Sequence, residues 1–263
     1  MNSSLTYNQH FEECVSLVNP NKKDHFVDTL NNLSVKLVSA PDQSSYSFLI
    51  DTLAQKVDEC FKTKQGVAED NFCLNIKDAL DFPEVTDIFN LFYDEIKENT
   101  YGCDFSANTV QIVRSHHTPE KFEASWIWHY DDNPEPSIKL FIYLTDVDSE
   151  HAPFTYISNP ETKECAKIES SRISPFKRVQ QQFEGSRIRD SHIDILAEMG
   201  MIPQELTGKA GTAFIFDPNI IHRATVPKPN NFRDALIFHL YPTKNKTPLE
   251  TVFGRDVKQY PLL

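Results

Sequence analysis

The sequence contains no run of about 18 or more apolar residues, so no segment of it is predicted to span a lipid bilayer. It also lacks an excess of positive charge, because 38 acidic residues oppose 26 basic ones and the net charge is −12 at pH 7. We therefore expect neither a nucleic-acid partner nor a membrane partner for its general surface. Residues 1–11 lack the charged and then apolar pattern of a signal peptide.

The cysteines form no metal-binding or redox motif. Their number is odd, and none is spaced as in a zinc site or a C-x-x-C sequence; they are Cys14, Cys60, Cys73, Cys103 and Cys165. The simplest expectation is a set of reduced, structural thiols in a cytoplasmic protein, where disulfides are rare. Any bound metal is then expected to have histidine and carboxylate ligands.

The length and composition indicate one domain. With 263 residues, of which 40% are hydrophobic and 24% charged, the chain can bury one large core. We predict a single domain over 1–263, with a mainly helical N-terminal cap (1–104), a β core (105–243) and a C-terminal tail (244–263). The core holds an insertion (159–207), which is expected to be either a solvated loop or a lid that closes over an anionic substrate group.

Two amphipathic helices are predicted in the N-terminal hundred residues. Apolar side chains recur at three- and four-residue spacing between Ser44 and Lys62. A second stripe follows Pro83, a favoured first helical residue, and Gly102 is expected to end it. The members of this second stripe are Val85, Ile88, Phe89, Phe92 and Ile96.

From Asn108 onward the sequence changes to short runs rich in β-branched and aromatic residues, separated by Pro, Asn, Asp and Gly. The predicted strands are 108–114, 124–131, 137–145, 153–158, 211–217, 219–226 and 232–241. A short helix is predicted at Ser191–Met199. Seven short strands without alternating helices indicate an antiparallel sandwich or barrel, with the N-terminal helices covering one face.

Three H-x-D/E triplets occur, and one of them lies where both side chains can bind the same metal ion. Residues i and i+2 of a strand point to the same side, and His129 and Asp131 end the predicted strand 124–131. The other triplets, His10–Glu12 and His192–Asp194, lie in the N-terminal arm and at the start of a predicted helix. A helix separates side chains i and i+2, so the sequence favours His129 and Asp131 as metal ligands.

The segment from Gly211 to Tyr241 predicts two strands joined by a turn at Pro-Lys-Pro-Asn-Asn. If strands 219–226 and 232–241 pair as a hairpin about this turn, His222 lies directly opposite Arg233. Directly opposed side chains share a face, with Cβ atoms about 5 Å apart. The sequence therefore predicts an imidazole beside a guanidinium on one wall.

These residue types suit one chemistry. Two histidines and one carboxylate on one side of a metal leave the other positions open, as in the facial triad of non-haem Fe(II) oxygenases. A 2-oxo acid and then O₂ can occupy those positions, and the distal carboxylate of 2-oxoglutarate needs the planar, permanent charge of arginine. We assign His129, Asp131 and His222 as metal ligands and catalytic residues, and Arg233 as the cosubstrate-binding residue.

Three stretches resemble the phytanoyl-CoA dioxygenase-like (PhyH) family of 2-oxoglutarate oxygenases: Trp128–Asp132, Ile138–Asp148 and Gly211–Tyr241. The likeness covers roughly 108–243. It implies a double-stranded β-helix (jelly roll), Fe(II) held by His129, Asp131 and His222, and a cosubstrate carboxylate bound by Arg233. Family members that halogenate have a small residue in place of the carboxylate ligand, so Asp131 implies hydroxylation or a related oxidation.

The chain departs from the family at several positions. Ala152-Pro153-Phe154 stands where the family often has Gly-Pro-Leu, and Ile157-Ser158-Asn159-Pro160 lies where it often has a Pro-Gly-Ser-His run. Ala224 occupies the position of a serine that helps to hold 2-oxoglutarate. Tyr143 and Gln111, on neighbouring predicted strands, are the proposed replacements among the cosubstrate-binding residues.

Three further predictions keep an alternative. Asp132 could replace Asp131 as a ligand, although its side chain should face away. His239 shares a face with Arg233 and is expected to be packed, or else to line the pocket. His116 and His117 are expected in a loop, or in contact with substrate.

The sequence thus predicts a 2-oxoglutarate-dependent, non-haem iron dioxygenase that hydroxylates a C–H bond of a small-molecule substrate with O₂ and releases succinate and CO₂. One alternative is a cupin-like metalloenzyme that uses no 2-oxo acid, which leaves Arg233 without a role. The other is a non-catalytic jelly-roll binding module.

Overall fold

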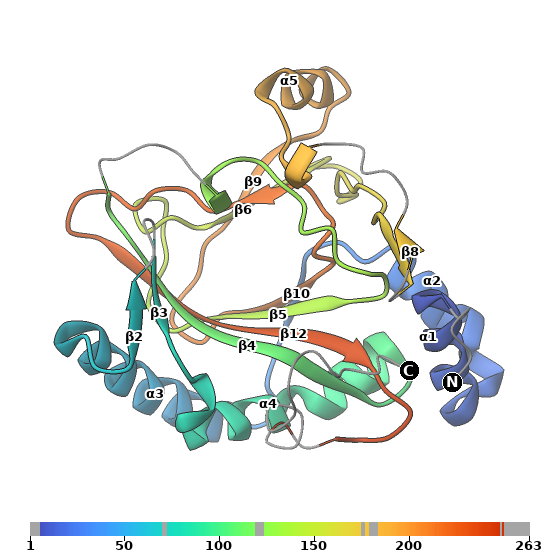
Figure 1. Cartoon of the computed structure of the whole chain (residues 1–263), viewed down its shortest axis with the longest axis horizontal. Helices are drawn as coiled ribbons and strands as arrows, with labels where there is room; N and C mark the ends of the chain where they lie inside the picture. Colours follow the sequence, from blue (N-terminus) through green and yellow to red (C-terminus); the bar gives the residue numbers. More distant parts are fainter. Residues whose placement is uncertain are drawn as a thin grey trace.

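The computed structural model describes residues 6–69, 73–118, 124–174, 177–178, 184–247 and 249 of the chain. A seven-stranded antiparallel sheet and a three-stranded antiparallel sheet form two layers, and helices lie on the outer side of the larger sheet (Figure 1). The predicted antiparallel sandwich with a helical N-terminal layer is confirmed.

The larger sheet joins strands from distant parts of the sequence. In spatial order its strands are β1 (Lys36–Val38), β10 (Ala213–Phe216), β5 (Ile138–Tyr143), β12 (Phe232–Pro242), β4 (Phe105–His116), β3 (Cys73–Ile76) and β2 (Val67–Glu69). The smaller sheet consists of β11 (His222–Arg223), β6 (Phe154–Ser158) and β9 (Ile202–Leu206). The N-terminal hundred residues thus add three strands to the predicted helices, β1 at one edge of the larger sheet and β3 and β2 at the other end. Each of these strands is too short to show a clear alternation.

Among the described residues, four α-helices precede the β core and one lies within the insertion. They are α1 (Tyr7–Val18), α2 (Lys23–Asn31), α3 (Gln43–Thr63), α4 (Pro83–Ile96) and α5 (Asp190–Glu198). The predicted helices at 44–62, after Pro83 and at 191–199 correspond to α3, α4 and α5. After α4 a single π-helical turn leads to Gly102, whose φ of 68° allows the chain to leave the helix. None of the described helices is long and apolar enough to cross a membrane.

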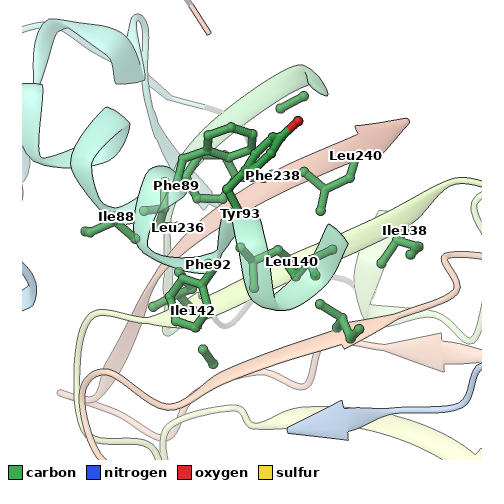
Figure 2. Packing of buried hydrophobic residues seen from close by; sticks show 14 of the residues in the cluster. Ile88, Phe89, Phe92, Tyr93, Ile138, Leu140, Ile142, Leu236, Phe238 and Leu240 are labelled. Atoms are coloured by element: carbon green, nitrogen blue, oxygen red, sulfur yellow. The ribbon is translucent and has the colours of Figure 1, made fainter. Parts of the chain in front are cut away.

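The face of the larger sheet that meets α4 is apolar. Alternate residues of β5 and β12 point toward this helix and are buried there (Figure 2). The residues shown from the two strands and from α4 are Ile138, Leu140, Ile142, Leu236, Phe238, Leu240, Ile88, Phe89, Phe92 and Tyr93. The intervening residues of the same strands point the other way, into the space between the two sheets.

Two local predictions are wrong. The segment predicted as strand 124–131 contains a 3₁₀ turn at Ala124–Trp126 and only isolated backbone bridges at His129. The predicted hairpin does not form either, because β11 pairs with β6 whereas β12 pairs with β4 and β5. The turn between β11 and β12 carries the chain from one sheet to the other, and turn residues do not encode which sheet the next strand joins.

The insertion at 159–207 is bonded to the core by backbone hydrogen bonds. The amide of Ala166 donates to Ile157 of β6, and the amide of Ile188 donates to Trp128 beside the predicted metal ligands. The insertion also contains β7 (Arg172–Ser174), β8 (Lys177–Arg178) and β9, which completes the smaller sheet. Helix α5 projects away from the two sheets (Figure 1).

Candidate metal centre

The two predicted histidine ligands are direct backbone partners. The amide of His129 donates to the carbonyl of His222 at 3.0 Å, and the amide of His222 donates to the carbonyl of His129 at 2.9 Å. Opposed residues of an antiparallel pair share a face, so the two imidazole rings lie side by side with centroids 4.3 Å apart. The partner of His222 is thus His129 and not Arg233, which corrects the predicted register.

Each imidazole is held in the orientation that metal binding requires. Nδ1 of His129 donates to the carbonyl of Ile127, and Nδ1 of His222 donates to the carbonyl of Ile220, both at 2.8 Å. A hydrogen bond from Nδ1 to a carbonyl leaves Nε2 unprotonated and free to bind a metal. Both rings are 5% exposed, so their orientation is also fixed by packing.

Asp131 completes the cluster. One carboxylate oxygen lies 3.7 Å from Nε2 of His129, and the other lies 3.8 Å from Nε2 of His222. The ligand atoms of the three residues all lie within 4.8 Å of one another. Within the described part of the chain, this is the one cluster of three or more His, Cys, Asp or Glu side chains with such a geometry.

The electrostatic surroundings keep the three groups in the protonation states that a metal needs. Burial, together with the neighbouring His222, lowers the pKa of His129 to about 3, and burial also lowers the pKa of His222. Burial by itself would raise the pKa of Asp131, but Lys139 and the two imidazoles hold it below its usual range. At neutral pH the imidazoles are therefore neutral and the carboxylate is ionised, as metal binding requires.

Lys139 was not identified from the sequence, yet it contacts the cluster directly. It lies on β5, and its ammonium nitrogen is 2.6 Å from a carboxylate oxygen of Asp131. A signal was present, because Lys139 has the same strand parity as Phe141 and Tyr143 and must point into the space between the sheets. A charged residue on the inner face of an otherwise apolar strand is therefore a candidate site residue.

Arg233 is buried in the same cavity and forms no ion pair with the residues that the structure describes. Its side chain donates to the carbonyl of Ala152 and to the hydroxyl of Ser115, the latter at 3.3 Å. Its Nε has no hydrogen-bond partner in the described structure, although the residue is only 6% exposed. A buried guanidinium with unused donors is costly unless a ligand supplies an anion, so this group is prepared to bind one.

Arg233 and the metal ligands line one cavity of about 260 Å³ between the two sheets. His129 and Asp131 reach it from the segment before β5, His222 from β11 of the smaller sheet, and Arg233 from β12 of the larger sheet. The cavity thus combines a metal-ligand cluster and a separate cation on opposite walls. Aromatic side chains close much of the remaining surface; they are Trp126, Phe141, Phe154 and Phe216.

The two predicted auxiliary residues occupy different places. The hydroxyl of Tyr143 donates to the carbonyl of Leu206 at 2.7 Å and accepts from the amide of Phe154 at 3.0 Å. Gln111 lines the cavity and pairs with Ile237 of β12, four residues beyond Arg233. Four residues of strand span about 13 Å, so Gln111 lies toward the end of the cavity that is remote from Arg233.

The alternative ligand Asp132 faces away from the cluster. Its carboxylate accepts from the amide and the hydroxyl of Ser171, both at 2.7 Å, and thereby ties the insertion to the ligand-bearing segment. His239 contacts Gln111 through a ring nitrogen at 3.3 Å, and burial and then Lys139 lower its pKa to about 3. The structure places both residues outside the metal-ligand cluster.

The other histidines that the sequence singled out lie apart from the cluster. His10 belongs to α1, where a ring nitrogen contacts the carbonyl of Pro242 at 3.3 Å, and His192 belongs to α5. His116 ends β4, and the ring of His117 bonds to the carbonyl of Pro227 at 2.8 Å. The structure therefore brings together one of the three H-x-D/E triplets with His222.

The donor set agrees with a small divalent transition metal. Two neutral imidazoles and one carboxylate suit iron and related ions, and the three donors lie on one side of the space that they share. The remaining side opens to the cavity that contains Arg233. A metal bound by the three side chains would keep coordination positions for ligands that enter from that cavity.

No protein-family model matches the chain, and no curated protein matches it either. The fold nevertheless has solved counterparts. The crystal structure of HygX from Streptomyces hygroscopicus, with nickel, 2-oxoglutarate and hygromycin B bound, has a TM-score of 0.51 and 11% identity, over 84% of this chain and 88% of HygX. The crystal structure of EctD from S. alaskensis, with 2-oxoglutarate and 5-hydroxyectoine, has a TM-score of 0.55 and 12% identity, over 84% of this chain and 77% of EctD. Likeness at this identity concerns the fold, and the chain has the double-stranded β-helix fold of these two proteins.

Proposed function

We propose that the chain is an Fe(II)- and 2-oxoglutarate-dependent dioxygenase that hydroxylates a C–H bond of a small-molecule substrate and releases succinate and CO₂. One observation carries the proposal: a His-Asp-His cluster shares a cavity with a buried arginine that has no acidic partner in the described structure. A metalloenzyme that binds no anionic cosubstrate has no need for such a cation. The structures of HygX and EctD with 2-oxoglutarate, which have the same fold, support the choice of cosubstrate.

In this proposal His129, Asp131 and His222 hold the iron. When bound there, iron supplies the means to activate O₂ and to oxidise an unactivated C–H bond. The protein contributes the orientation of the ligands, because each Nδ1–H is bonded to a backbone carbonyl and each Nε2 faces the shared space. The near-complete burial of both imidazoles also keeps bulk water from this side of the metal.

Arg233 is proposed to bind the distal carboxylate of 2-oxoglutarate. Its side chain is oriented by the carbonyl of Ala152 and by Ser115, which leaves its Nε and part of its donor capacity for the ligand. The aromatic ring of Phe141 lies 5.5 Å from the guanidinium carbon and limits the positions that the side chain can take. The cosubstrate would then extend from the metal toward β12.

We keep Tyr143 and Gln111 as proposed cosubstrate residues with different roles. Tyr143 is not among the residues that line the cavity, and we propose that it acts through Arg233: burial raises the pKa of the Tyr143 hydroxyl, and the charge of Arg233 opposes this rise. The position of Gln111, remote from Arg233 along the sheet, favours a contact on the substrate side. We further propose that the chain is a single oxygenase domain of the PhyH type that acts in the cytoplasm.

Anaerobic titration tests the proposal. The purified chain is mixed with Fe(II) and then with 2-oxoglutarate, and a weak visible metal-to-ligand charge-transfer band is expected only when all three are present. Arg233→Met should raise the concentration of 2-oxoglutarate that is needed to form this band, while leaving Fe(II) binding intact. A chain that binds Fe(II) without forming the band would be a metalloprotein of the cupin-like kind, and a chain that binds no Fe(II) would be a binding module.

A further inference from the structure

The charged residues that line the cavity are mostly positive, whereas the protein as a whole is negatively charged. The whole chain carries a net charge of −12, with 38 acidic residues against 26 basic ones. Among the described residues that line the cavity, however, the charged side chains are Asp131 and three cations, Lys139, Arg223 and Arg233. An acidic protein that gathers cations around one cavity focuses positive potential there, which attracts anions from solution.

Arg233 and Asp131 already have roles in the proposed function, whereas Lys139 and Arg223 do not. Lys139 contacts the carboxylate of Asp131, and its side chain is 13% exposed. A metal bound to Asp131 would share that carboxylate, so the charge of Lys139 would no longer be balanced by a carboxylate of its own. Lys139 thus adds positive charge next to the substrate side of the metal.

Arg223 lies beside His222 in β11 and, like Lys139, is partly buried. Its guanidinium carbon lies over the ring of Trp128, 4.2 Å from the centroid, and this cation–π contact restricts the positions of the side chain. Its Nε is buried without a hydrogen-bond partner in the described structure, and no ion pair to Arg223 is present there. Burial lowers its pKa without abolishing its charge, because arginine remains protonated at neutral pH. An oriented guanidinium with free donors is suited to bind a carboxylate or a phosphate.

The charges do not balance when the proposed ligands are added. Among the residues that line the cavity, three cations and a divalent metal would face one aspartate and a doubly charged 2-oxoglutarate, which leaves two positive charges in excess. Asp190 and Glu205, outside this lining, act on Arg223 and offset part of its charge. Uncompensated charge in a poorly hydrated cavity is unfavourable, so a further anion would be stabilised there. Gln111, at the end remote from Arg233, is neutral and offers no acidic partner to a cationic substrate.

We propose that the substrate is a small anion, and that its carboxylate or phosphate group binds to Arg223 at the cavity wall with Lys139 adding to the local potential. This inference rests on the proposed function, since it concerns the molecule that is oxidised at the same metal. The fold and the proposed metal ligands do not by themselves determine this class of substrate. Neutral and cationic molecules of the same size are expected to bind more weakly.

The test measures the thermal unfolding of the full chain loaded with Ni(II) and 2-oxoglutarate. Ni(II) takes the place of Fe(II) so that a ligand can bind without being oxidised. Acetate, inorganic phosphate, acetamide and methylammonium are compared at constant ionic strength. A ligand that binds the folded protein raises its melting temperature as the ligand concentration rises. We expect a rise with acetate or phosphate and none with acetamide or methylammonium; the better of the two anions indicates the anionic group of the substrate.

Three variants locate the effect. Arg223→Gln should raise the concentration of anion needed for half of the shift by about tenfold, which corresponds to one lost charged hydrogen bond. Arg223→Lys keeps the charge and should retain part of the shift. Arg189→Gln removes an exposed arginine outside the cavity and should behave as the unmodified chain does.

The inference is overturned if acetamide produces the same shift as acetate, if no anion produces a shift, or if Arg223→Gln retains the full shift. Failure of the proposed function has a different signature, because the charge-transfer band with Fe(II) and 2-oxoglutarate would then be missing. A chain that forms the band but does not respond to anions is still an oxygenase, with a neutral or cationic substrate.

Discussion

Two buried arginines on neighbouring strands of the larger sheet have opposite surroundings. Arg114 of β4 points toward the helices, where it donates to both carboxylate oxygens of Asp234 at 2.7 and 2.6 Å and to Asp58 of α3 at 2.9 Å. It is also flanked by the rings of Phe61 and Phe232. Nε and one terminal nitrogen of this guanidinium therefore have carboxylate partners from the fold, and its role is structural.

Arg233 of β12 points to the other face of the same sheet. The residue next to it, Asp234, turns toward Arg114, so strand alternation separates Arg233 from the nearest carboxylate along the chain. Its protein contacts are a carbonyl and a hydroxyl, and its Nε has none in the described structure. The comparison teaches that a buried cation whose charge the described fold leaves unpaired is a candidate for binding an anionic ligand.

Removal of Arg114 should have the largest effect on stability. Arg114→Met leaves Asp234 buried without its partner, and we expect the free energy of unfolding to fall by about 3–5 kcal/mol. Urea denaturation of the metal-free chain measures the loss. The matched control is Lys62→Met, which removes an exposed ion pair with Asp58 and should cost about 1 kcal/mol or less. Similar losses in the two variants would contradict the structural role of Arg114.

His222→Ala should abolish tight metal binding, since it removes one of three ligands. Loss of a residue that only supports a ligand already lowers metal affinity about 10–100-fold, so loss of a ligand should lower it by about 100-fold or more. Calorimetric titration with Ni(II) measures the affinity. His117→Ala removes an exposed histidine with a similar ring-to-carbonyl bond and should leave the affinity unchanged. An unchanged affinity in His222→Ala would refute the metal centre.

Arg233→Met should weaken ligand binding and leave stability intact, whereas Arg114→Met should lower stability. The Kd for 2-oxoglutarate, measured with Ni(II) present, should rise about 10–100-fold because hydrogen bonds to a charged group are lost. The free energy of unfolding of the ligand-free chain should stay the same or rise, because no ion pair is broken. A loss of stability as large as that of Arg114→Met would remove the distinction between the two arginines.

Ala152→Gly should have the smallest effect, a gain in stability. Ala152 has a φ of 59°, in the left-handed region that costs a residue with a Cβ atom about 1 kcal/mol relative to glycine. Its carbonyl accepts a hydrogen bond from Arg233, so this backbone position matters to the cavity. Thermal denaturation should show the gain, whereas Ala235→Gly, in the middle of β12, should lower stability. A loss of stability in Ala152→Gly would show that this strain is absent.

The sequence predicted which side chains would cluster at the candidate metal centre better than it predicted how their backbones pair. His129 and Asp131 were chosen because strand parity places residues i and i+2 on one side, and the structure does bring them together with His222. The segment is not a regular strand, however, and the backbone partner of His222 is His129. The turn residues do not determine the partner of β11, because β11 pairs with β6 and with the segment that carries His129.

Lys139 and Arg223 illustrate what was missed. Both follow from strand position once the sheets are known, but each stands in a segment whose partner strands are distant in sequence. The contact of Lys139 with Asp131 joins β5 to the segment before it, and the stacking of Arg223 on Trp128 joins β11 to that same segment. Neither contact leaves a periodic signal in the sequence.

The sequence by itself determined the helical layer, the antiparallel β core, and the identity of the metal-ligand candidates, because periodicity and side-chain chemistry are local properties of the chain. Only the tertiary structure decided that His129 opposes His222, that Arg233 faces the cavity from the other sheet, and that two further cations surround the site. The physical reason is that pairing across sheets depends on the packing of the whole core. A local pattern specifies which way a side chain points, but not what it meets there.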